Sequence, residues 1–188
     1  MPSGHVPTLL NRHPICIGDA TSLDSLYFSG VGPGTTNPSI RNHIRHIISA
    51  TAARTLSADE SGALCLFPAA TGFTYTLPAP VIGLWFEFLC TVTNTATVAK
   101  VITDSASTFL LGEVFLGVDN TTPAAGPGPK GYALNGTTHR AINQGGADTT
   151  TGGVIGSRFR VTCVSSTQWA AEGFLIGAGT IATPVATS

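Results

Sequence analysis

The chain has 188 residues and a formal net charge of −1 at neutral pH, and only 10% of its residues are charged. This length accommodates one domain, or one domain with an arm. The near-neutral charge excludes a strongly basic, polyanion-neutralising domain as the default and argues against charge-driven disorder.

The composition favours β-structure. The sequence contains 27 threonines, 12 valines and 12 isoleucines, but only 4 glutamates, 2 lysines, 2 glutamines and 1 methionine. β-Branched side chains pack well on a pleated sheet, and 22 glycines and 12 prolines supply frequent turns. We therefore expect an all-β fold, either an antiparallel β-sandwich or a jelly-roll-like domain.

The low charge also has a consequence for association. Charged surface residues keep soluble proteins apart, and this chain has few of them. We therefore hypothesise that partners cover much of its surface.

Residues 1–38 differ from the rest of the chain. They contain five prolines, a glycine-rich run at 30–34, and apolar residues without a long period. This pattern predicts an extended arm that packs on something, either a partner or its own domain, because free arms are usually polar. The apolar residues expected to contact a partner, another subunit or the chain's own domain are Leu9, Leu10, Ile15, Ile17, Leu23, Leu26, Tyr27 and Phe28.

Residues 39–48 allow two interpretations. Isoleucines at helical spacing predict a short helix or turn followed by a strand, and the competing interpretation is a strand that ends near Leu56. On a helix, His43 and His46 share a face and could bind a metal, but no third ligand with suitable spacing is visible. We therefore expect a solvated or interface histidine pair.

The next segment has the pattern of a strand-rich domain. Ser57 and Glu60 fit a capping box, which predicts one helical turn. Further on, alternation places Leu84, Phe86 and Phe88 on one face of a strand. The strand candidates are 63–67, 73–77, 84–93, 98–103 and 109–118.

Residues 119–157 are rich in Gly, Pro, Thr and Asn and show little periodicity, so we expect a long loop or insertion there. Alternation returns over residues 158–163, and residues 165–167 predict a hairpin turn before Trp169. The expected organisation is an arm over 1–38 and a β-sandwich domain over 39–188.

No motif in the sequence assembles an active site. Residues 126–131 match a dinucleotide-binding spacing, but the prolines remove backbone donors and no helix follows. The neighbouring carboxylates Asp59 and Glu60 are explained by the predicted helical turn. The four cysteines lack metal-binding spacing and are expected to stay reduced in the core. We predict no enzymatic activity, no cofactor and no metal.

Two stretches resemble a β-domain of tailed-phage virion proteins, mainly capsid decoration (cement) and head-fibre proteins. Residues 55–62, 73–80 and 83–88 are similar to the pattern TL-x-A-x-x-SG, LPAP and GL-x-F-x-F, and residues 161–184 around Trp169 are similar to its closing part. The turn before Trp169 reads Ser-Ser-Thr-Gln, where that family usually has Asp-Gly-Thr-Asn.

This resemblance implies a structural virion protein on the exterior of a phage capsid, made in the host cytoplasm. It would stabilise the capsid by clamping neighbouring shell subunits, with the major capsid protein and itself, as a homotrimer, as partners. Neither nucleic acid nor membrane is an expected partner. A structural core role is expected for Leu77, Leu84, Phe86, Phe88 and Trp169.

Two other functions stay open. The first alternative is a head-fibre, tail-fibre or spike module that binds a host surface glycan or receptor through residues 119–157. The second is a virion-associated hydrolase, although no sequence motif supports it.

Overall fold

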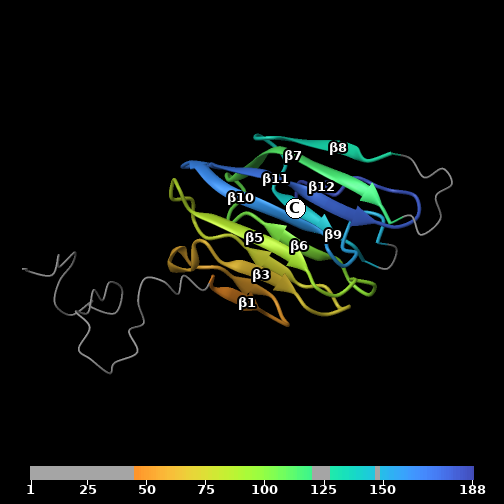
Figure 1. Cartoon of the computed structure of the whole chain (residues 1–188). Helices are drawn as coiled ribbons and strands as arrows, with labels where there is room; N and C mark the ends of the chain where they lie inside the picture. Colours follow the sequence, from red (N-terminus) through yellow and green to blue (C-terminus); the bar gives the residue numbers. More distant parts are fainter. Residues whose placement is uncertain (1–44, 120–127, 147–148) are drawn as a thin grey trace, which may run out of the picture. The chain divides into compact units, whose positions relative to one another are not determined.

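The computed structural model describes residues 45–119, 128–146 and 149–188, which belong to one compact unit (Figure 1). The predicted arm, with all eight of its expected contact residues, lies outside these ranges. The described residues form one short 3₁₀ helix and twelve strands: β1 (Ile47–Ser49), β2 (Arg54–Thr55), η2 (Ala58–Glu60), β3 (Leu64–Phe67), β4 (Thr74–Thr76), β5 (Trp85–Cys90), β6 (Ala99–Ile102), β7 (Phe109–Val118), β8 (Lys130–Asn135), β9 (Ala141–Gln144), β10 (Arg158–Ser165), β11 (Gln168–Gly177) and β12 (Val185–Ala186).

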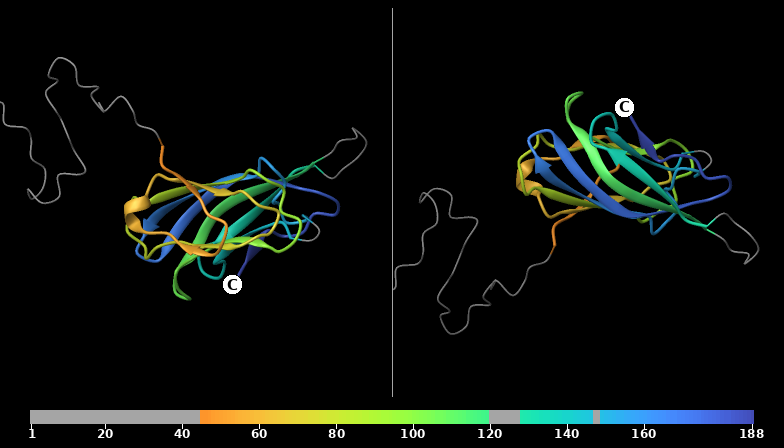
Figure 2. Two further views of the ribbon diagram at one scale, coloured as in Figure 1. Left: turned by 90° about the horizontal axis from the view of Figure 1, so that it is seen from below. Right: turned by 90° about the horizontal axis from the view of Figure 1, so that it is seen from above.

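The strands form two sheets. The seven-stranded sheet has the order β1-β3-β5-β10-β11-β7-β8, and the five-stranded sheet has the order β12-β9-β6-β4-β2. Buried residues from both sheets form one hydrophobic cluster, so the predicted all-β sandwich is confirmed. Figure 2 shows β7, β10 and β11 running side by side across the larger sheet.

Both sheets are mixed and not antiparallel throughout. In the larger sheet β1, β3 and β5 run parallel, as do β11 and β7, while β10 is antiparallel to both of its neighbours. In the smaller sheet β2, β4 and β6 run parallel.

The chain path explains these directions. From β1 to β7 each strand lies in the opposite sheet from the one before it. Each crossing to the other sheet reverses the direction of the chain. A strand that follows two crossings therefore runs in the original direction, so β1, β3 and β5 are parallel. Most of the short turns therefore join strands of different sheets.

The first half of the domain follows the sequence pattern closely. β3 to β7 each fall within a predicted strand segment. Leu77 and Pro78 follow the end of β4 and are buried, and the Leu77 amide donates to the Ile102 carbonyl at 2.8 Å. Gly83 has a φ of 95°, which permits the turn that leads into β5.

The predicted helical turn before β3 is also confirmed. The Ser57 amide donates to a carboxylate oxygen of Glu60 at 2.9 Å, and the Glu60 amide donates to the Ser57 carbonyl at 3.2 Å. Just before this turn, β1 and β2 occupy part of the ambiguous segment and the region near Leu56.

The predicted hairpin before Trp169 joins β10 and β11. Ser165 pairs with Gln168, and the register shifts between Cys163 and Ser165 through a β-bulge. The Ser165 hydroxyl accepts a hydrogen bond from the Thr167 amide at 3.3 Å. The hydroxyl of Ser165 thereby supports a turn that lacks the Asp-Gly sequence of the family pattern.

Residues 119–157 contain two strands and are not a loop throughout. β8 pairs with β7 at the edge of the larger sheet, and β9 lies inside the smaller sheet. Ala141 and Ile142 of β9 are fully buried, but polar Asn143 and Gln144 follow them and obscure the strand pattern. The Asn94 side chain donates to the Gln144 carbonyl at 2.8 Å and joins the two adjoining loops.

The core between the sheets is aromatic. Phe88 stacks on Phe159 with ring centroids 5.0 Å apart, and Phe86 lies 6.1 Å from Trp169. The Tyr75 hydroxyl donates to the Leu66 carbonyl at 2.9 Å, so this buried polar group has a partner.

Candidate functional site

The predicted core residues lie in the core, but Leu84 is less buried than the others. Leu77, Phe86, Phe88 and Trp169 are fully buried, and Leu84 is half-buried against the core. They build the inside of the sandwich, so the candidate functional groups lie elsewhere. We call the side of the seven-stranded sheet that faces away from the core the outer face.

The outer face has a charged region over β5 and β10. Glu87 of β5 is only 7% exposed. Its carboxylate forms an ion pair with Arg45 at 2.5 Å and a second ion pair with Arg158 of β10. Burial alone raises the pKa of Glu87, but the hydrogen bonds and charges of the two arginines outweigh it and lower that pKa.

Trp85, two residues before Glu87, lies between two cations. The Arg45 guanidinium is 5.2 Å from the Trp85 ring centroid, and the Arg160 guanidinium is 4.7 Å from it. Arg45 also donates from Nε to the Gly62 carbonyl at 3.1 Å. The first described residue of the chain is thus held on the outer face by an ion pair, a cation–π contact and a hydrogen bond.

A second region of the outer face lies over β7 and β11, which pair in parallel. Their register places Glu172 opposite Glu113 and Phe174 opposite Phe115. On each strand the glutamate and the phenylalanine are two residues apart and therefore share a face. The paired glutamates, which we call the carboxylate rung, therefore lie beside the paired phenylalanines, which we call the aromatic rung.

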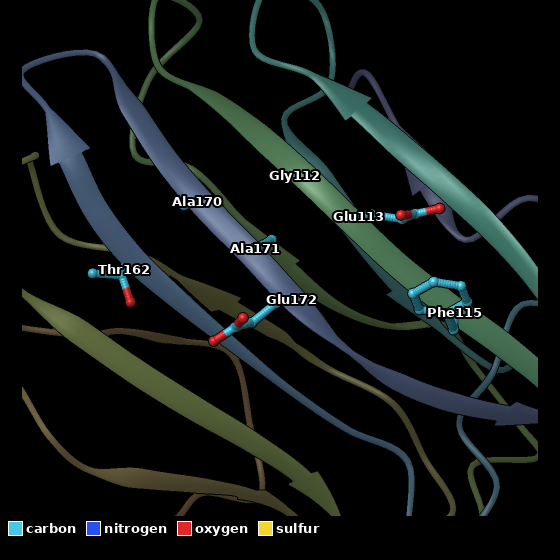
Figure 3. Close-up of a pocket in the computed structure, with 7 residues that line it drawn as sticks. All are labelled: Gly112, Glu113, Phe115, Thr162, Ala170, Ala171 and Glu172. Atoms are coloured by element: carbon cyan, nitrogen blue, oxygen red, sulfur yellow. The ribbon is translucent and has the colours of Figure 1, made fainter.

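A pocket of about 450 Å³ opens between these two strands and β10 (Figure 3). Small residues leave this space open between the carboxylates and the Phe115 ring. At Gly112, which has a φ of 111°, an added Cβ would lie 2.3 Å from the Ala171 carbonyl oxygen, so no larger residue fits there. The lining residues are Gly112, Glu113, Phe115, Thr162, Ala170, Ala171 and Glu172.

Both phenylalanine rings lean over glycines of the adjacent strand. A Cβ on Gly117 would lie 2.8 Å from the Phe174 ring, and a Cβ on Gly131 would lie 3.4 Å from the Phe115 ring. Phe115 is still 44% exposed and Phe174 49% exposed. The glycines support one side of each ring, and solvent reaches the rest.

Large apolar side chains are also exposed at the end of the sandwich near Arg45. Ile82 is 72% exposed, and Val81 and Val164 are exposed as well. The loop carrying Val81 and Ile82 reaches β10 through a hydrogen bond from the Gly83 amide to the Cys163 carbonyl at 3.0 Å. We call Val81, Ile82 and Val164 the apolar end.

The remaining chemical groups have structural explanations. Glu60 of the predicted acidic pair binds Arg54 and caps η2. Cys65 and Cys90 are buried, free thiols whose pKa burial raises to about 12, and Cys163 is also buried and free. Cys16 and His43 lie outside the described residues.

Within the ranges that the structure describes, no group of three or more His, Cys, Asp or Glu side chains is arranged to hold a metal ion. Across those same ranges, no helix has the length and apolarity needed to cross a bilayer.

Comparison with protein-family models, curated proteins and solved structures returned no significant match.

Sequence reasoning missed the pocket, although a signal for it exists. The tripeptide Glu-x-Phe occurs at 113–115 and again at 172–174, each time inside a strand pattern. The two copies are far apart in the sequence, and only the parallel pairing of β7 with β11 makes them neighbours.

Proposed function

We propose that this protein is a structural component of a phage virion, bound to the outer surface of the capsid, where it stabilises the shell by clamping neighbouring subunits. Sequence motifs resembling those of capsid decoration and head-fibre proteins suggest this role. The structural observation that carries the proposal is the exposure of large apolar side chains on a domain with few charges.

The exposed apolar side chains have the character of a surface that is covered in use. Only 10% of the residues are charged. Ile82, Val81 and Val164 are exposed at one end of the sandwich. Contiguous exposed apolar surface usually marks an interaction site. Burying it against a shell subunit would contribute about 25 cal/mol per Å² of apolar area, less the cost of association.

Arg45 gives the predicted arm a firm attachment point. The segment that precedes it is covalently joined to a residue held by Glu87, Trp85 and Gly62. If the apolar residues of 1–38 bind neighbouring shell subunits, a load on the arm is passed to the central strands of the larger sheet. Several such contacts on one oligomer must release together for dissociation, which slows loss from the capsid.

The test is binding of the purified full chain to capsids assembled without it. We expect saturable cosedimentation and a higher melting temperature of the decorated capsid. A chain lacking residues 1–38 should bind much more weakly, and Ile82→Asp should also weaken binding. Failure of the full chain to bind at any concentration would overturn the proposal, whereas full binding by the truncated chain would remove only the arm from it.

The fibre or spike alternative differs in its target. Such a module would bind the host cell surface, and the sequence analysis assigned that contact to residues 119–157. Strand β8 from this segment lies beside β7, so the segment borders the strands that carry the pocket. Saturable binding to host cells without binding to capsids would favour this alternative.

A further inference from the structure

We propose that the pocket between β7 and β11 is a binding site for a neutral saccharide, in which Glu113 and Glu172 accept hydrogen bonds from sugar hydroxyls and Phe115 packs against the apolar face of the sugar ring.

The carboxylate rung is the first observation. Glu113 and Glu172 lie directly opposite each other on adjacent parallel strands, which are about 4.8 Å apart. Their carboxylates point to opposite sides, that of Glu113 over Gly131 of β8 and that of Glu172 toward β10 (Figure 3). Neither carboxylate forms an ion pair within the part of the chain that the structure describes. Arg160 of β10 is the register partner of Glu172, and the two glutamates line the pocket from opposite sides (Figure 3).

The aromatic rung is the second observation. Phe115 lines the pocket next to Glu113, and Phe174 extends the apolar strip across β11. Each ring is supported from one side by a glycine and is close to half-exposed. An exposed ring beside hydrogen-bonding groups offers a ligand both apolar contact and orientation.

The combination of two carboxylates with an exposed aromatic ring indicates which class of ligand would bind. Ionised carboxylates only accept hydrogen bonds, and each has two oxygens that can bind adjacent hydroxyl donors. A sugar ring presents such donors along its edge and C–H groups on its face. Sialic and uronic acids carry a negative charge, which the two glutamates would repel. The volume of about 450 Å³ falls within the range of roughly 300–1,000 Å³ typical of small-molecule sites.

The pocket does not include the attachment point at Arg45, but it adjoins the apolar end, because Thr162 lies two residues before Val164 on the outer face of β10. In the order of the larger sheet, β3, β5 and β10 lie between β1 and the pair β11 and β7. Arg45 binds over β5, whereas the pocket opens over β7 and β11. The saccharide site does not depend on the proposed capsid role, and a protein that binds sugar but no capsid would refute only the latter.

The test uses the full chain on an array of neutral glycans built from glucose, galactose, mannose and N-acetylglucosamine, with sialylated and uronic-acid glycans on the same array. We expect binding to a subset of the neutral glycans and none to the acidic ones. Isothermal titration with the best neutral glycan should then show that Glu172→Gln and Phe115→Ala each weaken binding about tenfold or more.

Matched control variants lie elsewhere on the surface. Asp104→Asn removes an exposed carboxylate, and Ile155→Ala removes an exposed apolar side chain, both outside the pocket. We expect both to bind like the unaltered chain. Circular dichroism of every variant establishes that the fold is retained.

Three outcomes would overturn the proposal. The first is no binding to any neutral glycan on the array. The second is equal loss of binding in the pocket variants and the controls. The third is sedimentation showing that Phe115→Ala dissociates an oligomer that binds no glycan, which would assign this face to contact between copies of the chain.

Discussion

On the inner face of the seven-stranded sheet, Phe88 packs on Phe159 and Phe86 packs on Trp169, and all four belong to a buried cluster that includes residues of the second sheet. On the outer face of the same strands, Glu172 and Phe174 of β11 stay exposed. Different physical constraints therefore act on the two faces of the sheet. The inner face is fixed by packing, whereas the outer face retains polar and aromatic groups that packing alone does not require.

Trp169→Ala should produce the largest difference between the faces. Trp169 is fully buried, so its truncation should lower the free energy of unfolding by about 3–5 kcal/mol. Phe174→Ala, on the same strand but facing outward, should cost less than about 1 kcal/mol. Urea denaturation of both variants gives the comparison, and equal losses would show that the outer face is as tightly packed as the inner one. If Trp169→Ala does not fold, Trp169→Phe provides the same comparison with a smaller loss.

Glu87→Gln should have an intermediate effect because Glu87 is the one nearly buried carboxylate of the charged region. Loss of its charge-assisted hydrogen bonds to Arg45 and Arg158 should cost about 2 kcal/mol at neutral pH. The folded-state pKa of Glu87 is lowered, so its contribution is full above the ordinary carboxyl pKa and is lost as the pH falls through the lowered value.

Unfolding measured from about pH 7 down to about pH 2 tests this sign. The stability difference between the unaltered chain and Glu87→Gln should narrow as the solution becomes acidic. Glu172→Gln, which removes an exposed carboxylate without an ion pair among the described residues, is measured alongside as the control variant. A constant difference for Glu87→Gln across the range would contradict the ion-pair explanation.

Arg160→Ala should have a smaller effect than Glu87→Gln. The Arg160 guanidinium stacks on Trp85, whose other cation contact with Arg45 remains in the variant. We expect a loss of about 0.5–1 kcal/mol, measured by thermal unfolding. A loss as large as that of Glu87→Gln would show that Arg160 does more than stack on the ring.

Much of the inner face could be predicted from the sequence. Alternation in residues 84–88 placed Phe86 and Phe88 in the core, and the capping box at Ser57 and the hairpin before Trp169 were also found. Each of these features depends on residues that are close in the chain, where side-chain period and turn chemistry are direct signals.

Strand pairing and the pocket could not be predicted in the same way. The parallel partners β7 and β11 are separated by β8, β9 and β10, and nothing in either segment specifies the other. Strand β9 was missed because buried Gln144 follows Ala141 and Ile142 and interrupts the apolar pattern. Only the sheet register places Glu113 beside Glu172.

The proposal of a capsid-exterior protein is tested most directly by its copy number in purified phage particles. Quantitative mass spectrometry would compare peptides of this chain with peptides of the main shell protein. We predict a ratio of one to one or a simple fraction of it, as expected for a protein that covers the shell. A handful of copies per particle, or complete absence from particles, would contradict the proposed function.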